Sequence, residues 1–377
     1  MAKGEHACGA KAANHFLLGD KTMADVQKHF EKFHEAIKVK RFEENQTLME
    51  KRDIILGKLK KGLKDQFEEK GEPVPSYVTF NQGSYEMGTG VVPLDGDFDI
   101  DVGVSFFVAK DDHPDPVDVK EWVFNALDGH TKKVEMRRPC VTVFYQKDNE
   151  PVYHVDLAIY SDESSNPDGK KYLGKGKLAS SSDNRIWEVS DPQGVTKAVK
   201  DKHSGDDKAQ FIRVIRDLKR WKDFNFSCNG NSAPIGIGLT ICAYDWYQPQ
   251  KTLTDLVANK YTYNDLKALR IVVDSMISNF LSYSDGSETV ERLKVYLPVE
   301  PCSELFEKMT NNQMANLKKE LTQLLAALDE AENEVDPVKA CEALRKVFGE
   351  DFPVPAKADT GEKKSAAIIS SSASANV

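Results

Sequence analysis

The sequence lacks a long apolar run. No segment approaches the roughly 20 consecutive apolar residues that a membrane-spanning helix requires, although 40% of the 377 residues are hydrophobic. The N-terminal stretch MAKGEHACGAKAANHF has no continuous apolar core of the kind found in signal peptides. We therefore expect a protein of the cytoplasm with no membrane partner, large enough to bury the cores of one or two domains.

Paired cysteines and an excess of basic residues are also missing. The six cysteines include no C-x-x-C pair, which argues against a zinc ribbon. Several stand beside apolar residues, a context typical of buried thiols in a reducing compartment. A formal net charge of −9 argues against strong binding of duplex DNA, because phosphate binding needs a basic surface. A local basic pocket for a nucleotide remains compatible with this charge.

The hydrophobic pattern changes its period along the chain. A helical period over 25–69 predicts one or two long helices, and period-2 alternation within 76–160 predicts a mixed sheet with helices packed on it. A polar stretch at 162–183 is typical of a loop. Helical patterns then return at 208–223, 234–246, 254–281 and 311–348.

These patterns predict an α+β fold: a long helix, a sheet lobe and a helical C-terminal lobe. The Ser/Ala-rich C-terminal stretch is typical of disorder. We expect this tail either to be dispensable or to bind a regulatory protein. The expected parts are a flexible N-terminus over 1–22, the long helix and the sheet lobe over 23–200, the helical lobe over 201–355 and the tail over 356–377.

An unusual run of acids lies in one predicted strand. Asp97, Asp99 and Asp101 alternate with apolar residues, so their side chains share one face of the strand. A later strand carries a single acid, Asp156, between Val155 and Leu157. Convergent carboxylates on adjacent strands make a site for two hard divalent cations such as Mg²⁺, which would neutralise their repulsion. The alternative is the solvated face of an edge strand.

A glycine and a serine precede this run. Gly83-Ser84 follows the predicted strand 77–80, and a glycine turn lets backbone N–H groups approach a phosphate. Alone the pair carries little information, because turns often contain it. Its value lies in the order of strand, Gly-Ser, acid-bearing strand and later strand with one acid.

In this order of motifs the chain resembles the polymerase-β-like nucleotidyltransferases. The resemblance implies that Asp99, Asp101 and Asp156 are catalytic and hold Mg²⁺, with Mn²⁺ as an alternative. We choose Asp99 and Asp101 over Asp97 because apolar residues flank both. The resemblance also implies that the turn binds nucleotide through Gln82, Gly83 and Ser84.

Features after the third acid narrow the resemblance to the bacterial CD-NTases. Lys219 stands two residues before Trp221, where these enzymes have a lysine that contacts the triphosphate. Ser232 precedes a predicted buried helix and is expected to contact nucleotide. The N-terminal helix is similar to the spine that bridges the two lobes in these enzymes. The resemblance implies a cyclic oligonucleotide synthase of anti-phage signalling that uses ATP and GTP and acts on an effector through its product.

Further basic residues are candidates for nucleotide contacts. Arg216 lies one turn before Lys219 in a basic helical segment of an acidic protein, and distal phosphates need cationic donors. Arg137 and Arg138 would serve the second nucleotide or pair with local acids. By contrast, the glycines and lysines at 174–177 lack P-loop spacing, and we expect His154 to be a packed or hydrogen-bonded histidine.

Two other functions remain open from the residues alone. The same chemistry would serve another acceptor, such as an RNA end, a protein or a small molecule, and the negative charge disfavours RNA. A non-enzymatic scaffold with this fold is the second alternative, and the intact acids argue against it.

Overall fold

A computed structural model describes residues 23–39, 44–96, 98–147, 150–227, 232–286 and 288–356. The predictions made for Asp97, for the N-terminus up to residue 22 and for the tail from residue 357 lie outside these residues. Among the residues described, no helix is both long and apolar enough to cross a bilayer.

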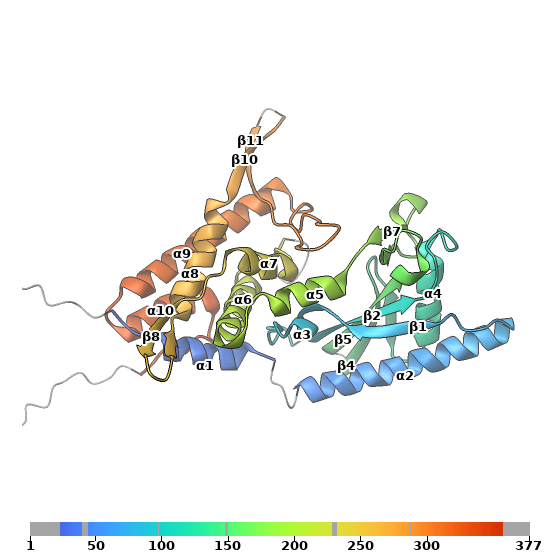
Figure 1. Cartoon of the computed structure of the whole chain (residues 1–377), viewed down its shortest axis with the longest axis horizontal. Helices are drawn as coiled ribbons and strands as arrows, with labels where there is room; N and C mark the ends of the chain where they lie inside the picture. The colour runs from blue at the N-terminus through green and yellow to red at the C-terminus, as the bar shows by residue number, and fades with distance from the viewer. Residues whose placement is uncertain are drawn as a thin grey trace, which may run out of the picture.

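The molecule has a sheet lobe and a helical lobe, which lie at the right and left of Figure 1. Within the described residues the sheet lobe holds a seven-stranded sheet with the order β1-β2-β5-β4-β3, extended from β5 by β6 and then β7. β2 and β5 run parallel and the other pairs are antiparallel. The strands are β1 (Tyr77–Asn81), β2 (Phe98–Phe106), β3 (Lys133–Met136), β4 (Val141–Lys147), β5 (Glu150–Ser161), β6 (Tyr172–Lys175) and β7 (Ile186–Val189).

The sheet has one apolar face and one polar face, because its strands alternate in character. Ile100, Val102 and Val104 of β2 are buried in a core with the apolar residues of β4 and β5. The helices α2 (Glu44–Lys70) and α4 (Pro116–Leu127) supply the rest of this core. The opposite face of β2 is left for Asp99 and Asp101, next to the short helix α3 (Gly83–Met87).

The helical lobe follows the sheet lobe in the chain. Its buried apolar residues form a second core, separate from that of the sheet lobe among the residues described. Two hairpins project from it in Figure 1. Its elements are α5 (Pro192–Asp201), α6 (Gly205–Asn225), α7 (Gly236–Trp246), β8 (Lys251–Asp255), β9 (Lys260–Tyr263), α8 (Asp265–Ser278), β10 (Phe280–Asp285), β11 (Glu288–Leu293), α9 (Asn311–Asn333) and α10 (Pro337–Phe348).

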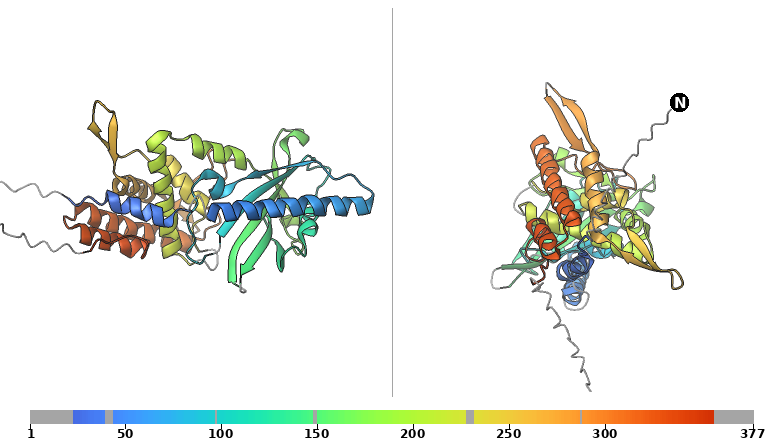
Figure 2. Two further views of the ribbon diagram at one scale, coloured as in Figure 1. Left: turned by 90° about the horizontal axis from the view of Figure 1, so that it is seen from below. Right: turned by 90° about the vertical axis from the view of Figure 1, so that its left-hand side faces the viewer.

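The N-terminal helical region consists of two helices that serve different lobes. α1 (Gln27–Ile37) buries Phe30 and Phe33 in the core of the helical lobe, whereas α2 packs against the sheet. The two helices follow one another along the length of the molecule in Figure 2. Of the one or two helices predicted over 25–69, the structure has two, α1 and α2, and together they connect the lobes.

The prediction of a helix over 254–281 is wrong at both ends. Residues 251–263 form the β8–β9 hairpin instead, because Asp255 accepts hydrogen bonds from the backbone of its turn and Asn259 adopts φ +48°. Helix α8 begins only after Asn264, whose side chain caps it. At the other end, the chain leaves the helix after Ser278 and enters the β10–β11 hairpin.

The polar stretch predicted as a loop contains a strand. β6 adds to the end of β5, where Tyr160 pairs with Leu173, and β7 adds to β6. The short strands β3, β6 and β7 were not predicted, because four residues give too few alternations to reveal a period.

Candidate functional site

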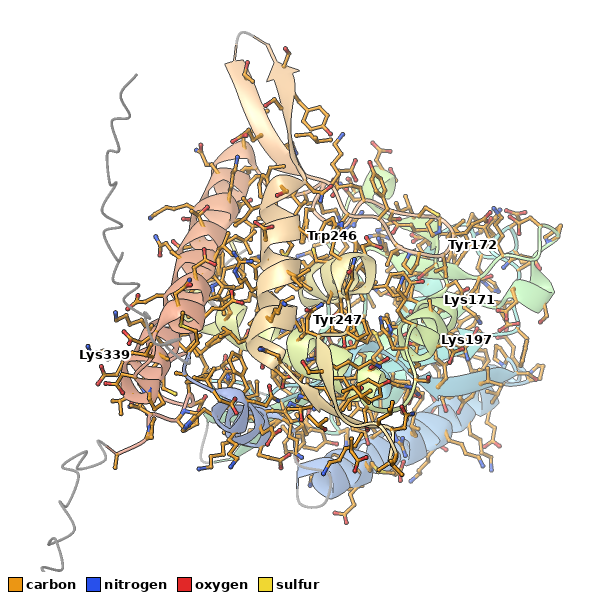
Figure 3. The ribbon with its side chains drawn as sticks, turned by 60° about the vertical axis from the view of Figure 1, so that its left-hand side comes forward. Lys171, Tyr172, Lys197, Trp246, Tyr247 and Lys339 are labelled. Atoms are coloured by element: carbon orange, nitrogen blue, oxygen red, sulfur yellow. The ribbon has the colours of Figure 1, made fainter. Side chains whose placement is uncertain are left out.

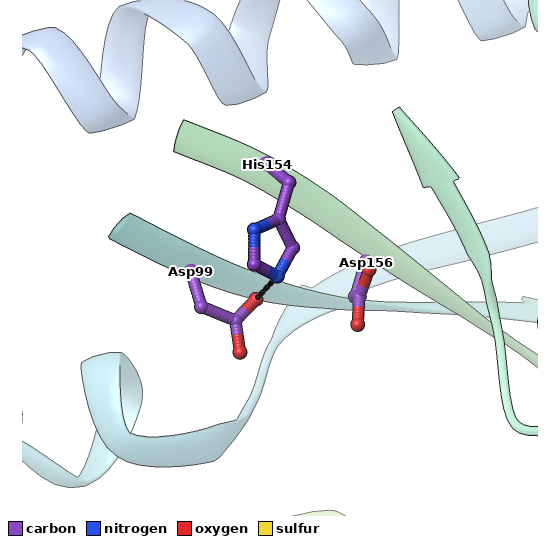
Figure 4. Close-up of side chains that lie close together, drawn as sticks. All are labelled: Asp99, His154 and Asp156. Carbon is purple, nitrogen blue, oxygen red and sulfur yellow. Dashed lines mark ion pairs between the residues drawn. The ribbon is translucent and has the colours of Figure 1, made fainter. Parts of the chain in front are cut away.

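Three predicted acids meet on the polar face of the sheet. Because β2 and β5 are parallel, Asp101 is paired with Asp156 across the two strands, and Asp99 is paired with His154. Figure 4 shows Asp99, His154 and Asp156 grouped over the two strands. The side-chain ligand atoms of these three residues all lie within 4.8 Å of one another.

Asp101 lies against the glycine turn. A Cβ atom on Gly83 would stand 1.9 Å from Oδ2 of Asp101, and Gly83 has φ +69°. Only glycine therefore meets both the backbone conformation and the close approach of the carboxylate. Burial and the neighbouring Asp156 raise the pKa of Asp101 to about 6.

Asp156 is held from the adjacent strand β4. Thr142 Oγ1 donates a hydrogen bond of 2.6 Å to Asp156 Oδ1, and Thr142 is itself fully buried. Cys140 lies beyond it, with Sγ 3.5 Å from Thr142 Oγ1. Burial, followed by the charge of Asp156, raises the pKa of the Cys140 thiol to about 12, so the thiol stays protonated at neutral pH.

Asp99 and His154 form the open side of the group. Nε2 of His154 lies 3.3 Å from Oδ1 of Asp99, and Asp99 is the more exposed partner, with 48% of its side chain accessible against 13% for His154. The Phe144 ring packs beside the imidazole at 5.9 Å between centroids. Asp99 and Phe144 therefore both contact the imidazole of His154 and restrict its position.

A cleft of about 350 Å³ opens over these acids between the two lobes. The glycine turn and the acids of β2 form one wall, and helices α6 and α7 form the other. Its lining includes Gly83, Ser84, Asp99, Asp101, Lys219, Lys222 and Thr240. The volume lies within the range of small-molecule sites.

Lys219 is the buried cation of this cleft. Its Nζ donates to the backbone oxygen of Thr89 at 3.2 Å and to Thr89 Oγ1 at 3.0 Å. Burial, followed by the nearby cations of α6, lowers the pKa of Lys219 to about 7. An anionic ligand in the cleft would favour the charged form, so this lysine suits a phosphate site.

Two other residues predicted to contact nucleotide, Gln82 and Arg216, make hydrogen bonds within the protein. The side-chain oxygen of Gln82 accepts a hydrogen bond from Tyr160 at 2.8 Å. Arg216 donates to the backbone oxygens of Gly88 and Gly90, at 2.7 and 3.1 Å, so it ties α6 to the chain after α3. It also lines a cavity of about 180 Å³ that includes Ser84 and Asp99.

Arg137, Arg138 and Ser232 lie outside the lining of these two cavities. Arg137 follows β3 and stacks over the Phe144 ring at 5.1 Å. The backbone oxygens of both arginines accept hydrogen bonds from the buried amine of Lys120. Ser232 precedes helix α7, and the N-terminal residue of that helix, Gly236, borders Lys219.

Two residues of the site were missed by sequence reasoning. Thr142 contacts Asp156 only because β4 pairs with β5 in the register that sets the two residues opposite each other. Thr89, which accepts from Lys219, lies in the loop between α3 and β2. A period-2 count from the buried valines of β4 would have placed Thr142 on the polar face, whereas nothing in the sequence marks Thr89.

The donor set fits a divalent metal ion. Carboxylate oxygens of Asp99 and Asp156 converge with an imidazole nitrogen within 4.8 Å. Burial, followed by the charge of Asp156, raises the pKa of Asp101, and a bound cation beside the two carboxylates would favour their charged forms.

Residues 78–160 match the family model described as cyclic GMP-AMP synthase DncV-like, nucleotidyltransferase domain. This segment holds the three acids and the glycine turn, so the match covers the part of the sheet lobe that carries the site. The match confirms the class that the order of motifs predicted.

Solved structures extend the likeness in fold to most of the chain. A mutant of the Vibrio cholerae dinucleotide cyclase DncV in complex with ATP and GTP is 15% identical, with a TM-score of 0.62 over 88% of this chain and 97% of that one. The Bradyrhizobium diazoefficiens CD-NTase CdnG in complex with GTP is 11% identical, with a TM-score of 0.63 over 86% and 95%. The chain thus carries a DncV-like nucleotidyltransferase domain within the CD-NTase fold.

Proposed function

We propose that this protein is a Mg²⁺-dependent synthase that joins nucleoside triphosphates into a cyclic di- or trinucleotide and releases pyrophosphate. The pairing of Asp101 with Asp156 across parallel strands carries the proposal, because Asp101 also lines a cleft that contains Lys219. The complexes of DncV with ATP and GTP, and of CdnG with GTP, support nucleotides as substrates.

In the proposed reaction, a ribose hydroxyl oxygen of one nucleotide forms a bond to the α-phosphorus of another. The bond from that phosphorus to the bridging oxygen breaks, and pyrophosphate leaves with the electron pair. A carboxylate oxygen of Asp156 orients the hydroxyl and receives its proton. A second such step within the linear product closes the ring.

Asp99, Asp101 and Asp156 would hold the metal ions in this proposal. Two divalent ions supply activation of the attacking hydroxyl and stabilisation of the leaving group. Lys219 provides a positive charge for the distal phosphates from the opposite wall of the cleft. The Gly83-Ser84 turn brings backbone N–H groups close to the same phosphates.

The biological setting follows from the same proposal. A cyclic nucleotide made in the cytoplasm would bind and activate a separate effector protein, as in anti-phage signalling of the CBASS type. Transfer to another acceptor, such as an RNA end, is the alternative outcome of the same chemistry.

The test is incubation with ATP, GTP, CTP and UTP, in parallel with Mg²⁺ and with Mn²⁺, followed by mass spectrometry of the products. We expect a cyclic product and pyrophosphate from the native chain and from an Asp112→Ala control, whose acid is exposed in a surface turn. The Asp99→Ala variant should give neither. A native-like product yield from Asp99→Ala, or no cyclic product from the native chain, would contradict the proposal.

A further inference from the structure

His154 lies beside the acids of the proposed metal site. It is paired with Asp99 across the parallel strands and lies two residues before Asp156 on β5, so all three side chains share one face. Nε2 lies 3.3 Å from the Asp99 carboxylate. From these positions we propose that His154 ligates the metal ion through Nε2 and thereby raises the affinity of the site for Mn²⁺ relative to Mg²⁺. The inference rests on the metal-dependent site proposed above.

The placement of the imidazole supports ligation. Its nitrogen and the carboxylate oxygens of Asp99 and Asp156 lie within 4.8 Å of one another, a separation that a single ion can bridge. Figure 4 shows the imidazole and the Asp99 carboxylate meeting on the side toward Asp156. The side chain of His154 is only 13% exposed, so packing has already removed most of its freedom to turn away.

Packing around the imidazole also restricts its orientation. The Phe144 ring lies beside it on β4, with an angle of 35° between the planes. Arg137 and Lys133 cover the Phe144 ring, with the guanidinium at 5.1 Å and the amine at 4.3 Å from its centroid. The imidazole is therefore in contact with the Phe144 ring and also lies close to the carboxylates of Asp99 and Asp156.

The chemistry of the added nitrogen donor decides which metal ion gains binding affinity. Mg²⁺ prefers oxygen ligands and keeps several waters. An imidazole nitrogen is a softer donor that first-row transition metals accept more readily. Three acids alone would leave Mg²⁺ as a natural occupant, whereas one histidine among them increases the advantage of Mn²⁺.

The direct test is pulsed electron paramagnetic resonance of Mn²⁺ bound to the full-length chain. A coordinated imidazole gives modulation from its ¹⁴N nucleus, which changes to the ¹⁵N pattern when the protein is labelled with ¹⁵N-histidine. We expect this signal from the native chain and its loss in His154→Gln. His130→Gln is the matched control, because His130 belongs to the same lobe and contacts Tyr145 instead.

Metal affinity gives a second measurement that requires no turnover. We expect His154→Gln to weaken Mn²⁺ binding by about tenfold or more, the scale on which supporting residues of metal sites act. Competition with Mg²⁺ should show a smaller change in Mg²⁺ affinity, so the preference for Mn²⁺ falls. His130→Gln should leave both affinities unchanged.

Each outcome has a defined meaning. Absence of nitrogen modulation in the native chain overturns the inference whether or not the variant folds, and so does modulation that persists in His154→Gln. Cyclic product formed without nitrogen ligation leaves the proposed function intact and removes only the role of His154. Nitrogen ligation without any nucleotide product supports the ligand and contradicts the proposed function.

Discussion

Gly83 is where the backbone of the glycine turn meets the buried acid. Replacing it with alanine would place Cβ 1.9 Å from Asp101 Oδ2, so the carboxylate must move. Because a displacement of about 1 Å at a reacting group can reduce a rate by roughly 10²-fold, we expect Gly83→Ala to lower the rate of product formation on that scale. Rates of product formation and melting temperatures would be compared.

The chain offers a matched control five residues later. Gly88 has the same φ of +69° but no atom within 4 Å of an added Cβ. Gly88→Ala should therefore lose only about 1–2 kcal/mol of stability to backbone strain and keep its catalytic rate. Equal losses of activity in the two variants would show that strain, and not the contact with Asp101, limits the turn.

Thr142 holds Asp156, the carboxylate that we propose receives the proton of the attacking hydroxyl. Thr142→Val preserves the shape of the side chain but removes the 2.6 Å hydrogen bond to the carboxylate. We expect kcat to fall by about tenfold, as for other supporting residues of metal sites, with little change in the KM for nucleotide. Thr142→Ser keeps the hydroxyl and should recover most of the rate. Steady-state kinetics of both variants would check this, and a serine variant no better than valine would contradict it.

At the scale of elements, a buried ion pair joins the ends of three strands. Asp162 follows β5 and accepts hydrogen bonds from Ser105 of β2 at 2.7 Å and from Lys171, just before β6, at 3.1 Å. Figure 3 labels Lys171 and its neighbour Tyr172 in the sheet lobe. Burial alone would raise the pKa of Asp162, but the hydrogen bonds from Ser164, Ser105 and Lys171 outweigh burial and lower it.

This pKa gives a pH-dependent stability with a definite sign. A carboxylate whose pKa is lowered by folding stabilises the protein above its unfolded pKa, near 4, and loses that contribution as the pH falls through the folded value. We expect Asp162→Asn to cost about 3 kcal/mol at pH 6 and progressively less toward pH 3. Urea unfolding at several pH values would measure the difference, with Asp112→Asn as the exposed control. A cost that does not change with pH would contradict the assignment.

The acids of the site could be predicted from sequence because each sits alone between apolar residues. Asp99 and Asp101 stand out for this reason, and so does Asp156. The roles of His154 and Thr142 depend on which residues of separate strands lie opposite one another, and strand register cannot be obtained from a single strand's pattern.

The prediction of helices and strands is limited in a similar way, because it depends on a period that the sequence must repeat. Long helices such as α6 repeat their period several times, so their existence could be predicted. The hairpin of β8 and β9 is exposed over nearly its whole length, so it has no buried face from which its period could be identified. Hydrogen bonds from the turn backbone to Asp255 and the positive φ of Asn259 set the structure of its turn, and these are local properties of the two residues.

Across the whole molecule, one helix of the helical lobe holds a loop of the sheet lobe. Arg216, Lys219 and Arg220 of α6 donate to backbone oxygens between residues 88 and 92. Arg220 is almost fully buried, and its bond to the Val92 oxygen is 2.7 Å long. The basic segment predicted from sequence is therefore partly a connection between the lobes.

Loosening this connection should affect both lobes. We expect Arg220→Met to destabilise the protein by about 2–3 kcal/mol, because it leaves the half-buried Val92 carbonyl without its charged donor, and to speed hydrogen exchange over 88–92. Thermal unfolding and exchange mass spectrometry would measure these effects. Lys339→Met on α10, at the far end of the molecule in Figure 3, is the control and should change neither. Exchange at 88–92 that matches the native chain would contradict this connection.

The division of the N-terminal helices has a consequence for how the chain is made. Phe30 and Phe33 of α1 pack on Phe348 and Phe352, with ring centroids 5.0–6.5 Å apart. On the ribosome, α1 is made before α2 and the sheet lobe, whereas Phe348 and Phe352 come from the last helix described and the residues just after it. The sheet lobe, from α2 to β7, can assemble during this interval, before the apolar face of α1 has its full set of partners. Completion of the helical lobe thus depends on synthesis of the chain through Phe352.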